Sequence, residues 1–279
     1  ESSWLQSTTS VTGRRETMTL DDEFMGQDMP VLLRALPATI TLTLWSMLVA
    51  LLVAVACGAF ILVRIPVLKQ LVIVINTFIK GVPLVIQLLF CYYAVPIVAK
   101  GLDGFLGYHF DPRNPPYFPA AVLALGLNFG AYITDVVVSS VRAIDHGQIE
   151  AGKACGMRRR EIIWHILLPQ VVVVSIPDMG NYFIWLLKGT SVASLVGVVE
   201  LLGTAKISAS QNYDFLEAYL VAALLYWVVC VVAEWLLNLL YARLGKFNIK
   251  EDDAMQQFSF FFLSKQAKSK LRRKVYVIA

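Results

Sequence analysis

Residues 35 to 63 form an apolar run, ALPATITLTLWSMLVALLVAVACGAFILV, that contains no charged side chain. A segment of this length can cross the ~30 Å hydrocarbon core of a bilayer as a helix with some tilt. Inside that core every backbone polar group needs a partner, and a helix supplies all of them within the segment. The run therefore restricts the chain to a helical membrane protein.

The rest of the composition agrees, since 57% of the residues are hydrophobic and only 16% are charged. A soluble domain usually carries about a quarter charged residues. We therefore predict an all-α integral membrane protein with about five transmembrane helices, at about residues 35–63, 67–98, 118–142, 162–187 and 214–242.

Several segments depart from a simple spanning pattern. Residues 80 to 83 (Lys-Gly-Val-Pro) interrupt the second helix, and two prolines and an aspartate interrupt the fourth. Residues 190–208 are apolar but short and rich in glycine, which predicts a partial or surface-lying helix. Residues 101–119 carry Gly, Pro and aromatic residues, as expected of a loop at the membrane–water interface.

The distribution of Lys and Arg predicts the orientation. With five spans, most of these residues fall on the side that holds residues 142–161 and the C-terminal tail. The positive-inside rule then places this side in the cytoplasm and the N-terminus outside. Residues 1–30 are polar and lack the apolar core of a secretory signal, and the chain begins at Glu1, so residues before it could be missing. Residues 246–279 form a basic tail, in which 258–274 either lies on the anionic leaflet or is solvated.

Catalytic and metal-binding patterns are absent from the sequence. It contains no GxxxxGK[ST] phosphate loop, and its three histidines lie far apart without partners at ligand spacing. The four cysteines are scattered and are interpreted as small apolar residues. We expect no catalytic residue, no metal site, no bound cofactor and no nucleic-acid partner, and therefore no enzyme activity in this chain.

The most specific signal is a spacing pattern after the third predicted helix. Glu150-Ala151-Gly152 is followed by three residues, Gly156, nine residues, and then Ile-x-Leu-Pro at 166–169. This resembles the EAA motif of permease subunits of type I ABC importers, EAA-x3-G-x9-I-x-L-P. Gly152, in place of the second alanine, is the sole departure at the signature positions.

Other segments resemble the polar amino-acid permeases of that class in the same order. KGVPLVIQLLFCYYAVP (80–96) is similar to RGTPLLVQL…YYGLP, and LLKGTSVASLVGVVEL (186–201) is similar to LLKDTSL.S.IGV.EL. Residues 127–156 are similar to the LN…AAY…E…I…GQ.EAA…LG stretch. The resemblance runs from about residue 30 to about 245, which defines a predicted permease domain at 31–245.

The resemblance implies that residues 147–160 form a coupling helix seated in a cytoplasmic ATPase subunit. The residues implied in this coupling are Glu150, Ala151, Gly152, Ala154, Gly156 and Arg158. Small side chains permit close packing against a partner, and Gly156 is expected to end the helix. Glu150 is expected near the helix start, where its charge favours the dipole. An ordinary cytoplasmic connecting helix with positive-inside charges is the alternative.

Charges within the spans mark candidate pathway residues, because they are costly in lipid. Asp135 either faces the pathway and meets a substrate ammonium or is paired within the protein. Lys80 either lines the pathway or extends to the interface. The tentative substrate-pathway set is Asp135, Lys80, Gln87, Asn128, Tyr132 and Lys188.

The resemblance further implies a second permease subunit, identical or paralogous, two ATPase subunits that use ATP and Mg²⁺, and an extracytoplasmic substrate-binding protein. It also implies a place in the bacterial cytoplasmic (inner) membrane and an amino acid as the transported molecule. A cystine or opine importer of the same class is an alternative. An ion-coupled secondary transporter is another, although the chain shows no convincing internal repeat.

Overall fold

The computed structural model describes residues 22–62, 65–106 and 117–244. Every regular element in these ranges is helical. The residues before 22 and the C-terminal tail, including the 258–274 stretch, lie outside the described residues, and so do the predictions made for them.

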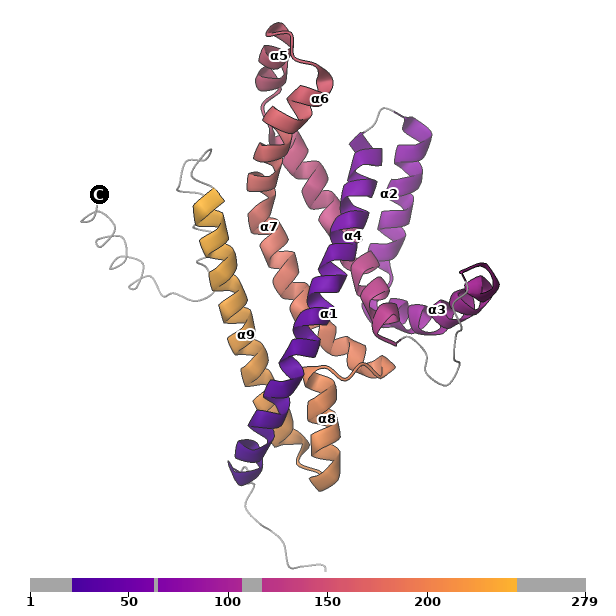
Figure 1. The fold of residues 1–279 in the computed structure, drawn as a ribbon, viewed down its shortest axis with the longest axis vertical. Helices are drawn as coiled ribbons and strands as arrows, with labels where there is room; N and C mark the ends of the chain where they lie inside the picture. Colours follow the sequence, from indigo (N-terminus) through magenta and orange to yellow (C-terminus); the bar gives the residue numbers. More distant parts are fainter. Residues whose placement is uncertain (1–21, 63–64, 107–116, 245–279) are drawn as a thin grey trace, which may run out of the picture.

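The helices follow one another along the chain with short connections (Figure 1). They are α1 (Asp22–Leu62), α2 (Pro66–Gly81), α3 (Leu84–Leu106), α4 (Tyr117–Ala143), α5 (His146–Ala154), α6 (Arg159–Ile162), the π-helical turn η1 (Ile163–Leu167), α7 (Leu168–Gly189), the 3-10 helix η2 (Thr190–Val196), α8 (Leu201–Asn212) and α9 (Phe215–Leu244).

The number of spans agrees with the prediction from the sequence. Among the described residues, four helices are long and apolar enough to cross a membrane, and the bent pair α2–α3 makes a fifth when it is counted as one span. The two helices of that pair meet at an angle of 105°. The interruption predicted at residues 80–83 is therefore confirmed, and it is a sharp break between two helices.

The first helix begins well before the predicted residue 35. It starts at Asp22. Its first turns mix apolar and polar residues, so hydropathy alone did not predict a helix there. Leu32 is fully buried, and Phe24 and Met29 pack on the same cluster, which also holds residues of α8 and α9. Burial on α8 and α9 thus stabilises a helical extension that lipid alone does not require.

The predicted single element at residues 190–208 is two elements. The 3-10 helix η2 ends at Gly197, whose φ of +84° is a left-handed conformation that glycine adopts without strain. Ala193 and Val196 of η2 are buried in one apolar cluster, whereas Leu201 and Ala205 of α8 are buried in another. The segment is therefore a pair of short helices, each with one buried side, as expected of a partial helix rather than a span.

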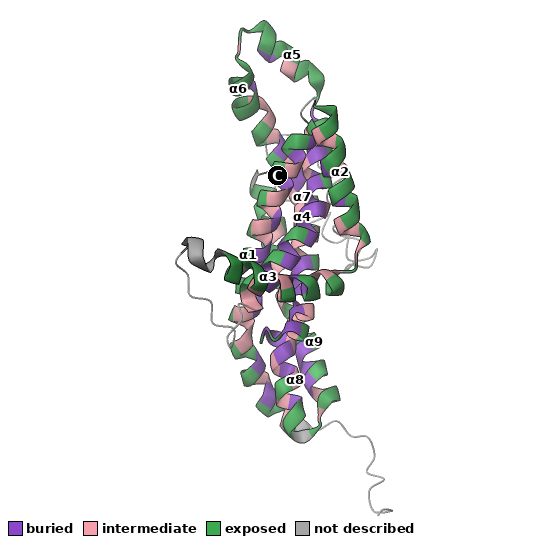
Figure 2. Cartoon of the chain, turned by 90° about the vertical axis from the view of Figure 1, so that its right-hand side faces the viewer, coloured by how far each residue is buried: buried purple, intermediate pink, exposed green. Residues whose placement is uncertain are grey.

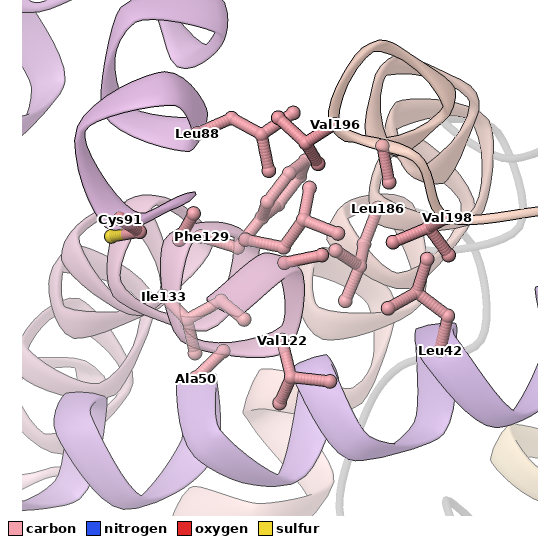
Figure 3. Close-up of a cluster of buried hydrophobic side chains, with 14 of the residues drawn as sticks. Leu42, Ala50, Leu88, Cys91, Val122, Phe129, Ile133, Leu186, Val196 and Val198 are labelled. Carbon is pink, nitrogen blue, oxygen red and sulfur yellow. The ribbon is translucent and has the colours of Figure 1, made fainter. Parts of the chain in front are cut away.

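The main core surrounds α4, which is the most buried of the long helices. Figure 3 shows the side chains of this cluster, including Leu42, Leu88, Phe129, Ile133 and Leu186. Helix α1 approaches α4 closely, because a Cβ atom at Gly126 would lie 2.5 Å from Val49. Small residues at such a crossing let the backbones approach, as in other membrane helix pairs.

The two ends of the molecule are formed by different helices. Helices α5 and α6 lie at one end, and α8 lies at the opposite end beside the first turns of α1 and α9 (Figure 1). Figure 2 shows many exposed residues along the long helices between the ends. Large apolar side chains are among the exposed ones, including Trp45, Phe78 and Trp235. Exposed apolar surface of this extent is expected where lipid is the solvent.

Candidate functional site

Helix α5 is a short helix with defined signals at both ends. At its start, the Asp145 carboxylate accepts a hydrogen bond from the Gly147 N–H at 2.9 Å, which satisfies a free donor of the first turn. At its end, Gly156 has a φ of +77°. The Gly156 N–H donates to the Lys153 carbonyl at 2.9 Å, and the Met157 N–H donates to the Gly152 carbonyl at 3.0 Å.

This pair of bonds is a Schellman turn, which requires a left-handed residue at the position of Gly156. The prediction that Gly156 ends the helix and reverses the chain is therefore confirmed. The chain then turns into α6, where the Arg158 N–H donates to the Glu161 carboxylate at 2.7 Å. The reversal sets α5 beside α6 and η1 at the end of the molecule.

Gly152, the departure from the motif, is the buried residue of α5. A Cβ atom here would lie 3.0 Å from Cδ1 of Ile166 and 3.2 Å from Cγ1 of Ile162. These two isoleucines therefore fill the space that an alanine side chain would take. Gln148 links α5 to α7, since its side-chain oxygen accepts from the Gln170 amide at 2.5 Å.

The other small residues of α5 face away from this contact. Ala151 and Ala154 are exposed, as is Glu150 between the helix ends. The expectation that Glu150 lies near the helix start is wrong: α5 begins at His146, and the carboxylate at its start belongs to Asp145. Asp is a favoured N-cap residue, so Asp145 could have marked the helix start in the sequence. The prediction instead placed the start from the EAA-like motif.

A second group of predicted residues meets at the break between α2 and α3. Pro83 has no N–H to donate to the Ile79 carbonyl four residues earlier. The side-chain amide of Gln87 takes that place, because its Nε2 atom lies 2.5 Å from the Ile79 oxygen and 2.9 Å from the Val82 oxygen. One side chain thus partners two of the carbonyls at the break.

Three residues of α4 face this break. The Asn128 amide donates to the Gln87 oxygen at 3.3 Å, and the Tyr132 hydroxyl lies 3.4 Å from the Lys80 carbonyl. The Lys80 ammonium lies 2.6 Å from an Asp135 carboxylate oxygen. Because residues 128, 132 and 135 are spaced by one helical turn each, a single face of α4 supplies all three contacts.

Five of the six predicted pathway residues therefore lie together at the break, where the Asp135 side chain is 65% exposed and the other four are buried or partly buried. Lys188 is the exception: it is exposed near the end of α7, and within the described ranges no hydrogen bond or ion pair joins its side chain to the other five. Tyr182 lies beside these residues, because its ring stacks on Tyr132 at a centroid distance of 6.0 Å.

Sequence reasoning also gave no role to Glu200. This carboxylate is fully buried at the start of α8, where it accepts from the Leu202 and Gly203 N–H groups and from the Tyr226 hydroxyl of α9. Burial raises its pKa, while the Tyr226 bond, the backbone bonds and the nearby charge of Lys206 oppose that shift. The sequence carries no clear signal for this role, because glutamate is not among the favoured N-cap residues.

Comparison with known proteins identifies the fold class first. The fold matches the crystal structure of an amino acid ABC transporter with histidines, with a TM-score of 0.68, 29% identity, and coverage of 81% of this chain and 100% of that one. It also matches an inward-facing methionine ABC transporter, MetNI, with a TM-score of 0.60 and 17% identity over 77% of this chain and 97% of that one. The architecture is therefore that of a type I ABC importer permease.

The family follows from the sequence matches. Residues 46–246 match the family of binding-protein-dependent transport system inner membrane components. The probable amino-acid ABC transporter permease protein PatM of Vibrio harveyi is 33% identical, over 81% of this chain and 100% of its own length. The L-cystine transport system permease protein TcyB of Bacillus subtilis is 32% identical, over 79% of this chain and 89% of its own. The chain belongs to this family, and the resemblance drawn from its motifs is confirmed.

Proposed function

We propose that this chain is the permease subunit of an ATP-driven amino-acid importer. It pairs with a second permease subunit, identical or paralogous, and works with two cytoplasmic ATPase subunits and an extracytoplasmic substrate-binding protein. Family membership and the names of the relatives support this assignment. The chain itself binds no cofactor, and ATP and Mg²⁺ act in the ATPase subunits.

The observation that carries the proposal is the division of α5 into two faces. Gly152 packs on Ile162 and Ile166, so this face holds the helix against the membrane domain. Ala151 and Ala154 are exposed on a helix with little apolar surface of its own. A protruding helix with short side chains outward suits insertion into a groove of a second protein.

Contacts of α5 give a route for coupling. Because Gly152 lies against Ile166, and Gln148 is bonded to Gln170, a displacement of α5 acts directly on the start of α7. Its other end follows α4 after only Ile144 and Asp145. Closure of two ATPases would then move α4 and α7 together, and these two helices pack against each other.

The transported molecule is proposed to be a polar or charged amino acid. The network of Lys80, Gln87, Asn128, Tyr132 and Asp135 supplies carbonyl, amide, hydroxyl and charged groups at a broken helix, a type of site that lines substrate paths in transporters. Relatives described as cystine and nopaline permeases keep cystine and an opine as alternatives.

The decisive experiment blocks the outward face of α5. Ala151→Trp adds a bulky side chain to an exposed position, so the chain should insert normally but lose its ATPase subunit on co-purification. Ser210→Trp, at an exposed position of α8 at the opposite end, is the matched control and should retain the ATPase. Gly156→Asp, which strains the left-handed turn, should likewise insert but lose ATP-driven uptake.

Full uptake by both α5 variants would contradict the proposed coupling. Uptake driven by an ion gradient in reconstituted vesicles without ATP would contradict the importer assignment itself.

A further inference from the structure

A pocket of about 630 Å³ lies between α1, α2 and α4, on the half of the molecule that carries α5. Lys69 of α2 and Arg142 of α4 line it, together with Asp135 and Ser139 of α4. The pocket is thus formed by charged and hydroxyl groups from two different helices.

The charge of this pocket is positive. Asp135 is its carboxylate, and the Lys80 ammonium 2.6 Å away already neutralises it. In the described ranges, no carboxylate lies within ion-pairing distance of Lys69 or Arg142. Two cations from separate helices are therefore available to one anionic ligand, and a phosphate with several acceptor oxygens can bind both at once.

The pocket also has an apolar wall, formed by Ile61, Ile73 and Val138. The outer face of α2 beside it is exposed and apolar, with Phe78 70% and Val67 79% accessible. Acyl chains are the expected neighbours of that face in a bilayer. A ligand with a phosphate headgroup and hydrocarbon chains matches both parts of the surroundings, whereas a small zwitterion matches only the polar part.

One further polar group lies on the same helix. Asn76 is only 3% exposed, and neither its amide nitrogen nor its oxygen has a hydrogen-bond partner in the described part of the chain. It follows Lys69 and Ile73 at helical spacing on α2 and precedes Lys80 by one turn. A buried amide without partners is costly, but Asn76 is not among the residues that line the pocket, so a ligand in the pocket need not contact it.

We propose that this pocket binds the headgroup of an anionic phospholipid from the leaflet at the α5 end of the molecule. Lys69 and Arg142 hold the phosphate from two sides and thereby tie α2 to α4. The positive-inside pattern assigns this end to the cytoplasmic leaflet, where basic pockets between helices bind anionic headgroups.

The site would also act on α5. Arg142 lies in the last turn of α4, three residues before Asp145, which caps α5. A lipid that fixes the end of α4 therefore limits how far α5 can move relative to α2. Anionic lipid is therefore expected to stabilise the protein and to restrict the movement of α5 relative to α2 when a partner docks.

The test titrates the purified full-length protein in neutral detergent with dioctanoyl phosphatidylglycerol and measures the melting temperature. Dioctanoyl phosphatidylcholine, inorganic phosphate and free amino acids are titrated in parallel. Phosphatidylglycerol should raise the melting temperature saturably, and the other three should not. Lys69→Gln or Arg142→Gln should weaken the apparent affinity about fivefold, and the double variant roughly thirtyfold.

Two control variants separate a site from general charge effects. Arg243→Gln, in the last turn of α9, removes a cation elsewhere and should leave the affinity unchanged. The charge-conserving pair Lys69→Arg and Arg142→Lys should retain binding, which shows that loss in the Gln variants is a loss of charge and not of folding.

Equal affinity in the wild type and the double Gln variant would overturn the proposal. So would an equal loss in Arg243→Gln, failure of the charge-conserving variants to bind, or saturation of the same site by phosphate or an amino acid. The experiment measures lipid binding, so neither result supports or contradicts the proposed transport function.

Discussion

The Lys80 ammonium lies 2.6 Å from a carboxylate oxygen of Asp135, and this ion pair joins the last turn of α2 to the middle of α4. The two residues are 55 positions apart in the chain. Each is costly in a membrane span when it stands alone. Together they form a neutral unit beside the break that Pro83 introduces, and the broken helix is held at this point by charge as well as by packing.

We predict that the two charges are energetically coupled. Lys80→Met leaves the Asp135 carboxylate without its counter-ion, and Asp135→Asn does the same to the ammonium. The double variant should therefore be less destabilised than the sum of the single ones, by about 1 kcal/mol. Thermal unfolding of the four proteins in detergent measures this coupling. Strict additivity of the two effects would show that the pair contributes nothing to the fold.

The Gln87 side chain should be required for the break between α2 and α3. Gln87→Leu keeps a side chain of similar volume but removes the amide that donates to the Ile79 and Val82 carbonyls. Each unpaired buried group costs about 1–3 kcal/mol, so a clear loss of melting temperature is expected. Gln27→Leu, whose amide contacts only an exposed Glu23, is the control and should change stability by less than about 0.5 kcal/mol. Equal melting temperatures for the two variants would contradict the role of Gln87.

Glu200 should make stability depend on pH. Burial raises the pKa of this carboxyl above the ordinary value of 4.5. Between 4.5 and the raised value, the folded chain holds a proton that the unfolded chain has lost. The contribution of Glu200 to stability is therefore fully favourable below that window and declines as the pH rises through it.

Melting temperatures from pH 4 to pH 8 test this dependence. The difference between the wild type and Glu200→Gln should fall as the pH rises above 4.5, whereas Glu23→Gln, at an exposed position, should run parallel to the wild type. Parallel curves for Glu200→Gln as well would show that the buried carboxyl does not titrate in this range.

Local patterns in the sequence were enough to predict the spanning segments and the turn at the end of α5. Uncharged runs mark the spans because lipid excludes charge. The Gly156 turn was expected because glycine adopts a left-handed conformation without strain. The break at Pro83 was also visible, since proline removes a helix bond. Its angle of 105° was not, because it depends on which helices pack against each side.

Contacts between distant residues were beyond the sequence. The pathway residues could be proposed singly as polar groups in spans, but nothing in the chain order states that Lys80 reaches Asp135 or that Gln87 replaces the proline N–H. The start of α1 was missed for the same reason, since Leu32 is buried by α8 and α9, which follow much later in the chain.

The last prediction concerns Gly152, the position where the motif departs from alanine. Gly152→Ala places a methyl group 3.0 Å from Cδ1 of Ile166, the far end of a flexible side chain, so a small shift accommodates it at a cost below about 1 kcal/mol. Gly152→Leu exceeds the available space and should push α5 away from η1, at a cost of about 1–3 kcal/mol. ATP-driven uptake should survive the alanine and be lost with the leucine.

Shortening the opposing side chain is the control for this steric argument. Ile166→Val removes the methyl group that contacts the Gly152 position, so it should relieve part of the leucine defect while it leaves Gly152→Ala close to the wild type. Rescue would show that the contact between α5 and η1 transmits the coupling movement. A leucine variant with full uptake, or one that Ile166→Val makes no better, would mean that α5 does not depend on this packing.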